Sequence, residues 1–78
     1  MTTEEKMQAA FVEGLGIDAE ATDWDTLSYR SIEQWDSIAH MALVVAIEDA
    51  FDVMLDTSDI IDMSSYRVAL KILDSLDP

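Results

Sequence analysis

The chain has no cysteine, one proline and only two glycines among its 78 residues. Without cysteine it can form neither a disulfide nor a cysteine metal site, and it has no thiol of its own for thioester chemistry. Few glycines and prolines, together with plentiful Ala, Leu, Met, Glu and Asp, favour helices over strands. Because half of the residues are hydrophobic, we expect one folded domain over residues 1–78 rather than a disordered tail.

Basic residues are also scarce, since four Lys and Arg face seventeen Asp and Glu. A surface with a formal charge of −13 repels nucleic acids and anionic membranes, so we expect neither as a partner. The acidity could serve only to keep a small monomer soluble, or it could attract basic patches on partner proteins. Composition alone leaves both interpretations open.

Targeting signals and membrane spans are missing from the sequence as well. Residues 2–6 are polar and acidic, unlike a secretory signal peptide. No apolar run is long enough to cross a bilayer. We therefore expect a cytoplasmic protein.

Helical signals begin at the N-terminus. Thr2 and Glu5 form a capping box, and Gly14 and Gly16 are predicted to end the helix that follows. Residues 17–35 show no clean period and predict a long ordered loop, with a short helical turn near Thr26. The expected anchors of this loop are Leu27, Tyr29 and Ile32.

Three further helices are predicted in the second half of the chain. Asp36 caps an apolar segment over residues 38–51 that ends at Asp52, and a short helix follows near Ile60. Ser65 caps the last helix, whose inner stripe is Tyr66, Ala69, Ile72, Leu73 and Leu76. The predicted fold is all-α, a four-helix bundle with a long first loop and a short third helix.

The tripeptide Asp36-Ser37-Ile38 lies where the long loop meets the second helix. A phosphate ester on the Ser37 hydroxyl would face the positive end of the helix dipole and free backbone N–H groups. Taken alone, however, an Asp-Ser pair is also an ordinary helix start. The tripeptide by itself therefore favours the ordinary helix cap.

The surrounding stretch WDSIAHMALVVAIEDAFDVML resembles the acyl carrier protein family. In that family an Asp-Ser-Leu or Asp-Ser-Ile motif opens the second helix, and a Leu-x-x-x-(Leu/Ile)-Glu-(Glu/Asp)-x-Phe pattern closes it. The matching positions are Asp36, Ser37, Ile38, Leu43, Ile47, Glu48, Asp49 and Phe51. Length, acidity, the long first loop and the four-helix layout are also similar, so an acyl-carrier-type bundle is expected.

The resemblance implies that a carrier protein synthase transfers 4'-phosphopantetheine from coenzyme A to Ser37, with Asp36 and Ile38 beside the attachment point. The thiol of this arm would hold acyl groups as thioesters and deliver them to fatty-acid, polyketide or other dedicated acyl-pathway enzymes. The protein itself would catalyse nothing. This implied role explains how thioester chemistry could occur without cysteine.

The resemblance also gives the acidity a role, because the second helix of the family docks on basic patches of enzymes. Between Ser31 and Tyr66 there is no Lys or Arg, while eight acids occur. The residues expected to contact partners are Val45, Glu48, Asp49, Asp56 and Asp59. Ala39 and Ala42 stand where fatty-acid carriers often have acids, which fits a specialised carrier in a secondary pathway.

Four side chains near the motif carry separate expectations. His40 is predicted to be a solvated helix residue, and it has no second histidine with which to bind a metal. Trp35 could either contact partners and the arm or pack inward to fix the loop. Met41 is expected to be partly core and Val45 exposed.

An acyl chain is expected to slip between the helices, because an apolar chain in water is costly. The predicted lining is Ile47, Leu55, Ile60, Met63, Ala69 and Ile72. The competing hypothesis is an acidic helical adaptor that binds a basic partner and needs no modification. An enzyme has little support, since no nucleophile and base stand at a recognisable spacing.

Overall fold

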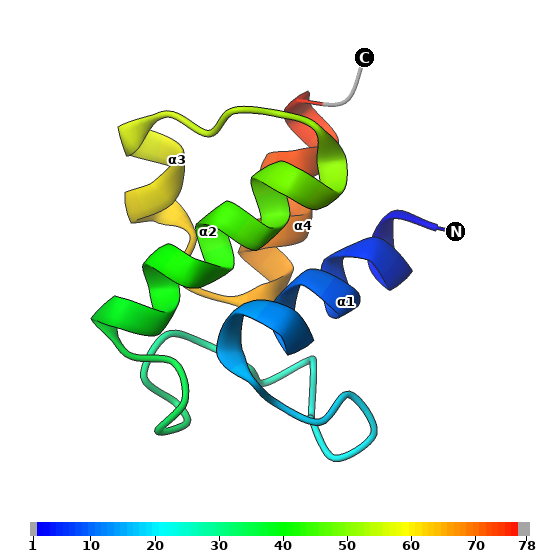
Figure 1. Cartoon of the computed structure of the whole chain (residues 1–78), viewed down its shortest axis with the longest axis vertical. Helices are drawn as coiled ribbons and strands as arrows, with labels where there is room; N and C mark the ends of the chain where they lie inside the picture. Colours follow the sequence, from blue (N-terminus) through cyan, green and yellow to red (C-terminus); the bar gives the residue numbers. More distant parts are fainter. Residues whose placement is uncertain (1, 77–78) are drawn as a thin grey trace.

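The computed structural model describes residues 2–76, apart from the side chain of Leu76. Within this range the chain forms four helices and no strand: α1 (Thr3–Leu15), α2 (Ser37–Phe51), α3 (Thr57–Asp62) and α4 (Tyr66–Leu76). Figure 1 shows α2 crossing in front of α4, with α1 on one side and the short α3 on the other. The all-α prediction is confirmed for the part of the chain that the structure describes.

Each of the first three helices begins at a side-chain cap that the sequence contains. Thr2 accepts from the Glu5 N–H at 3.1 Å, Asp36 from the Ala39 N–H at 2.8 Å and Asp56 from the Asp59 N–H at 2.9 Å. These bonds satisfy N–H groups that have no acceptor within the helix. The predicted starts of the helices follow from these local caps.

Ser65 caps α4 in the same way, since its hydroxyl accepts from the Val68 N–H at 3.1 Å. At the other ends, Gly16 closes α1 with a φ of 68° and Asp52 closes α2 with a φ of 53°. Both residues adopt the left-handed conformation that commonly ends a helix. The predicted ends at Gly16 and Asp52 are therefore confirmed.

Gly14 does not end α1 but lies inside it, against α2. A β-carbon at this position would come within 2.6 Å of the Leu43 Cα, so only glycine permits this close approach. The prediction that Gly14 stops the helix is wrong. The residue instead sets how closely α1 and α2 pack.

The core is built around Phe11 of α1, which contacts three other rings edge-on. Its ring centroid lies 5.3 Å from that of Trp35, 5.4 Å from Tyr66 and 5.9 Å from Trp24. Such edge-to-face pairs add to the free energy of area burial. Trp35 is completely buried, so of its two predicted roles the inward one is observed.

The loop over residues 16–36 is held by hydrogen bonds to the start of α4 as well as by packing. The Tyr29 N–H donates to the Ser64 carbonyl at 2.7 Å, and the Tyr66 N–H donates to the Leu27 carbonyl at 3.1 Å. Leu27 is buried as predicted, and Tyr29, although 36% exposed, anchors the loop through its backbone and through ring contacts with Trp35 and His40. Near Thr26 the chain makes one hydrogen-bonded turn, in which the Thr26 N–H donates to the Asp23 carbonyl at 3.3 Å. The short turn of helix that was predicted there does not form.

Every helix within residues 2–76 is too short or too polar to cross a bilayer. Nor do three His, Asp or Glu side chains in this range gather closely enough to hold a metal ion.

Candidate functional site

Ser37 is the first residue of α2, and its side chain is exposed to solvent. Asp36 precedes it in an extended conformation and caps the helix through its carboxylate. The Asp36 carbonyl also accepts from the His40 N–H at 2.8 Å. The serine hydroxyl is thus presented at a fixed helix start, at the edge of the protein.

The backbone N–H groups of Ser37 and Ile38 lie in the first turn of α2. By the geometry of an α-helix neither has an acceptor within the helix, and both lie at the positive end of its dipole. A negative group there is stabilised by roughly 0.3–1 kcal/mol. The next residue, Ile38, is 82% exposed, so the start of α2 projects into solvent on both residues.

The loop turns back toward the site at Arg30, which has a positive φ of 66°. The Arg30 N–H donates to the Trp35 carbonyl at 3.0 Å. A cavity of about 390 Å³ lies here, lined by Arg30, Ser31, Ile32, Glu33, Trp35 and Asp36. Interaction with Tyr29 raises the pKa of the Arg30 guanidinium further above its ordinary value. An arginine is protonated at neutral pH in any case, so Arg30 places a positive charge in this cavity.

His40 is not the solvated residue that was predicted. Its ring is half-buried, and Nδ1 accepts from the Trp35 indole N–H at 2.9 Å. Because an indole N–H can only donate, the imidazole is neutral and carries its proton on Nε2. That nitrogen lies 2.9 Å from the Ile60 carbonyl, to which it donates.

The His40 contact matters because α3 contains no buried residue. A second tie to this region comes from Glu48, whose Oε2 accepts from the Leu55 N–H at 2.9 Å. Glu48 is half-buried, and its carboxylate forms a hydrogen bond within the protein. The sequence had predicted that this side chain contacts a partner. Side chains of α2 hold the short helix and the segment before it.

The other residues that were predicted to contact partners differ in how far their side chains are exposed. Val45 is 61% exposed, as predicted, and Asp49 is also exposed. Asp56 is exposed but caps α3, and Asp59 is half-buried.

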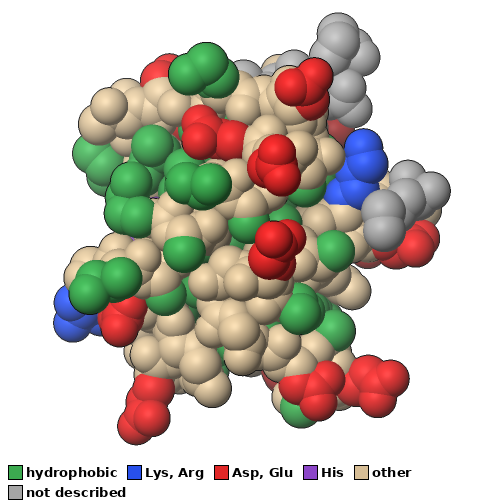
Figure 2. Space-filling view, viewed as in Figure 1, with side chains coloured by type: hydrophobic (Ala, Val, Ile, Leu, Met, Phe, Trp, Pro, Cys, Tyr) green, Lys and Arg blue, Asp and Glu red, His purple; other side chains and the backbone are tan. Residues whose placement is uncertain are grey.

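Met41 is 52% exposed, so its assignment to the core is wrong. With Ile38, Val45 and Ile61 it belongs to the exposed hydrophobic side chains of α2 and α3. Figure 2 shows hydrophobic side chains gathered over α3 and the first half of α2, with acidic side chains beside them. The exposure of Val45 was predicted, but that of Met41 was not, because α2 is apolar on nearly every side.

The predicted acyl lining forms ordinary core in this structure. Ile47, Leu55, Met63 and Ala69 are buried, while Ile60 and Ile72 are half-buried. None of the six lines the cavity within the first loop, the cavity beside Arg30 or the two cavities beside α1 and α4.

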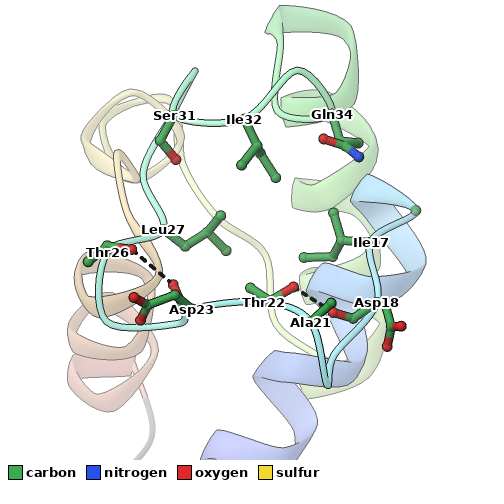
Figure 3. Close-up of a pocket in the computed structure, with 11 residues that line it drawn as sticks. Ile17, Asp18, Ala21, Thr22, Asp23, Thr26, Leu27, Ser31, Ile32 and Gln34 are labelled. Carbon is green, nitrogen blue, oxygen red and sulfur yellow. Dashed lines mark hydrogen bonds between the residues drawn. The ribbon is translucent and has the colours of Figure 1, made fainter.

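A cavity of about 490 Å³ lies instead within the first loop (Figure 3). Sequence reasoning missed it. Its only signal was the spacing of apolar Ile17, Leu27 and Ile32 along a polar loop.

No protein-family model matches the chain, and searches of curated proteins and of solved structures also give no match.

Proposed function

We propose that the chain is an acyl carrier protein with an acyl-carrier-type helical fold, and that Ser37 carries 4'-phosphopantetheine. One observation carries the proposal. An exposed serine opens α2 behind an aspartate cap, within the segment of residues 35–55 that resembles the carrier family. As proposed, the protein delivers acyl groups to enzymes and catalyses no reaction itself.

The residues around Ser37 fit a phosphate ester. The free N–H groups at the start of α2 and the charged Arg30 offer donors to a negative group, and the hydroxyl is accessible to a modifying enzyme. The arm would supply the thiol that this cysteine-free chain lacks. Asp36 holds the helix start in place, and Ile38 on the other side of the serine is exposed.

The surface beside Ser37 supports the proposed partners. Exposed Ile38, Met41, Val45 and Ile61 offer an apolar centre, and Asp49 and Asp56 offer negative charge near it. Such a surface is complementary to an apolar contact with a basic rim on a carrier synthase or an acyl-using enzyme. The pathway we propose is a fatty-acid, polyketide or other dedicated acyl pathway.

Intact-mass spectrometry after incubation with coenzyme A and a carrier protein synthase tests the proposal. The protein should gain the mass of one phosphopantetheinyl group, and Ser37→Ala should gain none. Thr57→Ala is a matched control, because Thr57 is also an exposed hydroxyl residue directly after an aspartate cap. This variant should be modified like the wild type.

An unmodified wild-type protein would overturn the carrier assignment and favour the acidic adaptor. Modification of Ser37→Ala would show that the arm is attached elsewhere.

A further inference from the structure

The loop between α1 and α2 encloses a hollow of about 490 Å³. Ile17, Leu27 and Ile32 point into it from three sides (Figure 3). Its volume lies within the range of about 300–1,000 Å³ that is common for small-molecule sites. The loop therefore surrounds a preformed hollow that is lined by both apolar and polar side chains.

Polar groups on the rim hold the shape of this hollow. The Thr22 hydroxyl donates to the Asp18 carbonyl at 2.6 Å, and the Ser31 hydroxyl donates to the Ser28 carbonyl at 2.7 Å. Gln34 also lines the hollow, and its carboxamide takes part in none of the hydrogen bonds found within residues 2–76. This carboxamide can donate to and accept from a guest.

The hollow lies close along the chain to the start of α2. The cavity beside Arg30 shares Ser31 and Ile32 with the hollow and extends to Asp36, the neighbour of Ser37. Gln34 is three residues before Ser37, and three residues span at most roughly 11 Å. An extended phosphopantetheine arm is longer than this separation.

We propose that the hollow is the resting place of the phosphopantetheine arm on Ser37 while its thiol is free. This inference rests on the proposed function. In this placement the phosphate lies near Arg30, the dimethyl carbon near Ile32, and the amides near the polar rim at Ser31 and Gln34.

The alternative place, the core between α2, α3 and α4, is filled by buried side chains such as Ile47 and Ala69. Entry of the arm there requires packed side chains to separate, whereas the hollow is already open. Two amides would also lose their hydration in an apolar core without a matching set of partners. The loop hollow therefore suits the polar arm better than the core does.

Amide spectra of ¹⁵N-labelled protein before and after modification test the inference. The amide signals of residues next to Ser37 will shift wherever the arm lies. The deciding signals are those of Ile17, Thr22 and Leu27, which line the hollow and are distant from Ser37 in the sequence. We expect these three amides to shift and the arm methyl groups to show nuclear Overhauser contacts with Leu27 and Ile32. The free thiol should also react with a disulfide reagent several-fold more slowly than an unhindered thiol.

A matched pair of loop variants separates occupancy of the hollow from general effects. Ala21 lines the hollow and Ala19 does not, although both are exposed in the same loop. Ala21→Phe should remove the shifts of the three deciding amide signals and restore fast thiol reaction, while Ala19→Phe should leave both as in the wild type.

The possible failures are distinguishable. A mass that shows no attachment at Ser37 overturns the proposed function. Attachment with shifts confined to residues 36–40, and with equal thiol reactivity in both variants, overturns the resting place alone.

Discussion

The indole N–H of Trp35 donates to Nδ1 of His40 at 2.9 Å, and the same imidazole reaches the Ile60 carbonyl with its other nitrogen. One neutral side chain thereby joins the loop before Ser37, the first turns of α2 and the end of α3. Trp35 is fully buried, so its N–H has no water to replace this acceptor. The start of α2 is consequently coupled to a helix that has little packing of its own.

We predict that His40→Leu lowers the free energy of unfolding by roughly 1–3 kcal/mol, because it leaves the buried Trp35 N–H without an acceptor. His40→Gln should cost less, since a carboxamide offers one acceptor and one donor. Urea unfolding of the two variants measures this difference. The ¹⁵N shifts of wild-type His40 should show the proton on Nε2, and equal stability of both variants with the wild type would contradict the role.

This arrangement shows where sequence reasoning succeeds and where it stops. The cap at Asp36 was predictable because its acceptor and the Ala39 donor are three residues apart in one local pattern. The role of His40 was not, because its partner Ile60 lies 20 residues away on another helix. Periodicity placed His40 on α2 but could not say which element faces it.

Gly14 illustrates the same limit. Glycine is a poor helix former, so its position near Gly16 suggested a helix end. The structure shows that a close approach to Leu43 decides its presence instead. Whether a glycine ends a helix or admits a neighbour depends on tertiary packing, which a single sequence does not reveal.

Alkaline pH should destabilise the protein through Tyr66. Burial raises the pKa of Tyr66, and Gln8, which donates to its hydroxyl at 3.2 Å, offsets only part of this effect. The unfolded chain loses the phenol proton near pH 10 while the folded protein retains it, so the free energy of unfolding falls as pH rises through that value.

Tyr66→Phe should remove this contribution, because it has no phenol proton to lose. Urea unfolding measures the free energy of unfolding at each pH from about 9 to 11. This free energy should decline less steeply with pH in the variant than in the wild type. If the free energy of unfolding falls equally steeply with pH in both proteins, Tyr66 is not the source of the pH dependence.

Asp49→Lys should slow modification of Ser37 by a carrier synthase several-fold, because Asp49 is exposed on α2 near the proposed contact surface. The loss should shrink in high salt, since exposed charges are screened beyond about 8 Å at physiological ionic strength. Glu13→Lys makes the same charge change on α1 and should have little effect. Glu48 is unsuitable for this test because its carboxylate holds the Leu55 N–H.

An equal loss in the Asp49 and Glu13 variants would instead indicate a response to total charge. A loss in Asp49→Lys that persists in high salt would indicate a disturbed fold.

The last prediction concerns an acyl chain on the arm, which differs from the free thiol in being apolar. Each buried CH₂ group contributes roughly 0.8 kcal/mol, so a medium-length chain can compensate for opening a packed core. The predicted lining includes Ile47 of α2, Ile60 of α3 and Ile72 of α4. Since no residue of α3 is fully buried, this helix is the element expected to move aside.

An eight-carbon chain should therefore raise the melting temperature above that of the acetylated protein, which is the matched control. A stabilisation of 1 kcal/mol corresponds to about 4–8 °C in a domain of this size. Methyl signals of Ile47, Ile60 and Ile72 should shift with the long chain only. If Ile17 and Ile32 shift instead, the chain occupies the loop hollow, and the core lining is wrong. Equal melting temperatures with unchanged signals at both places would mean that the chain stays in solvent.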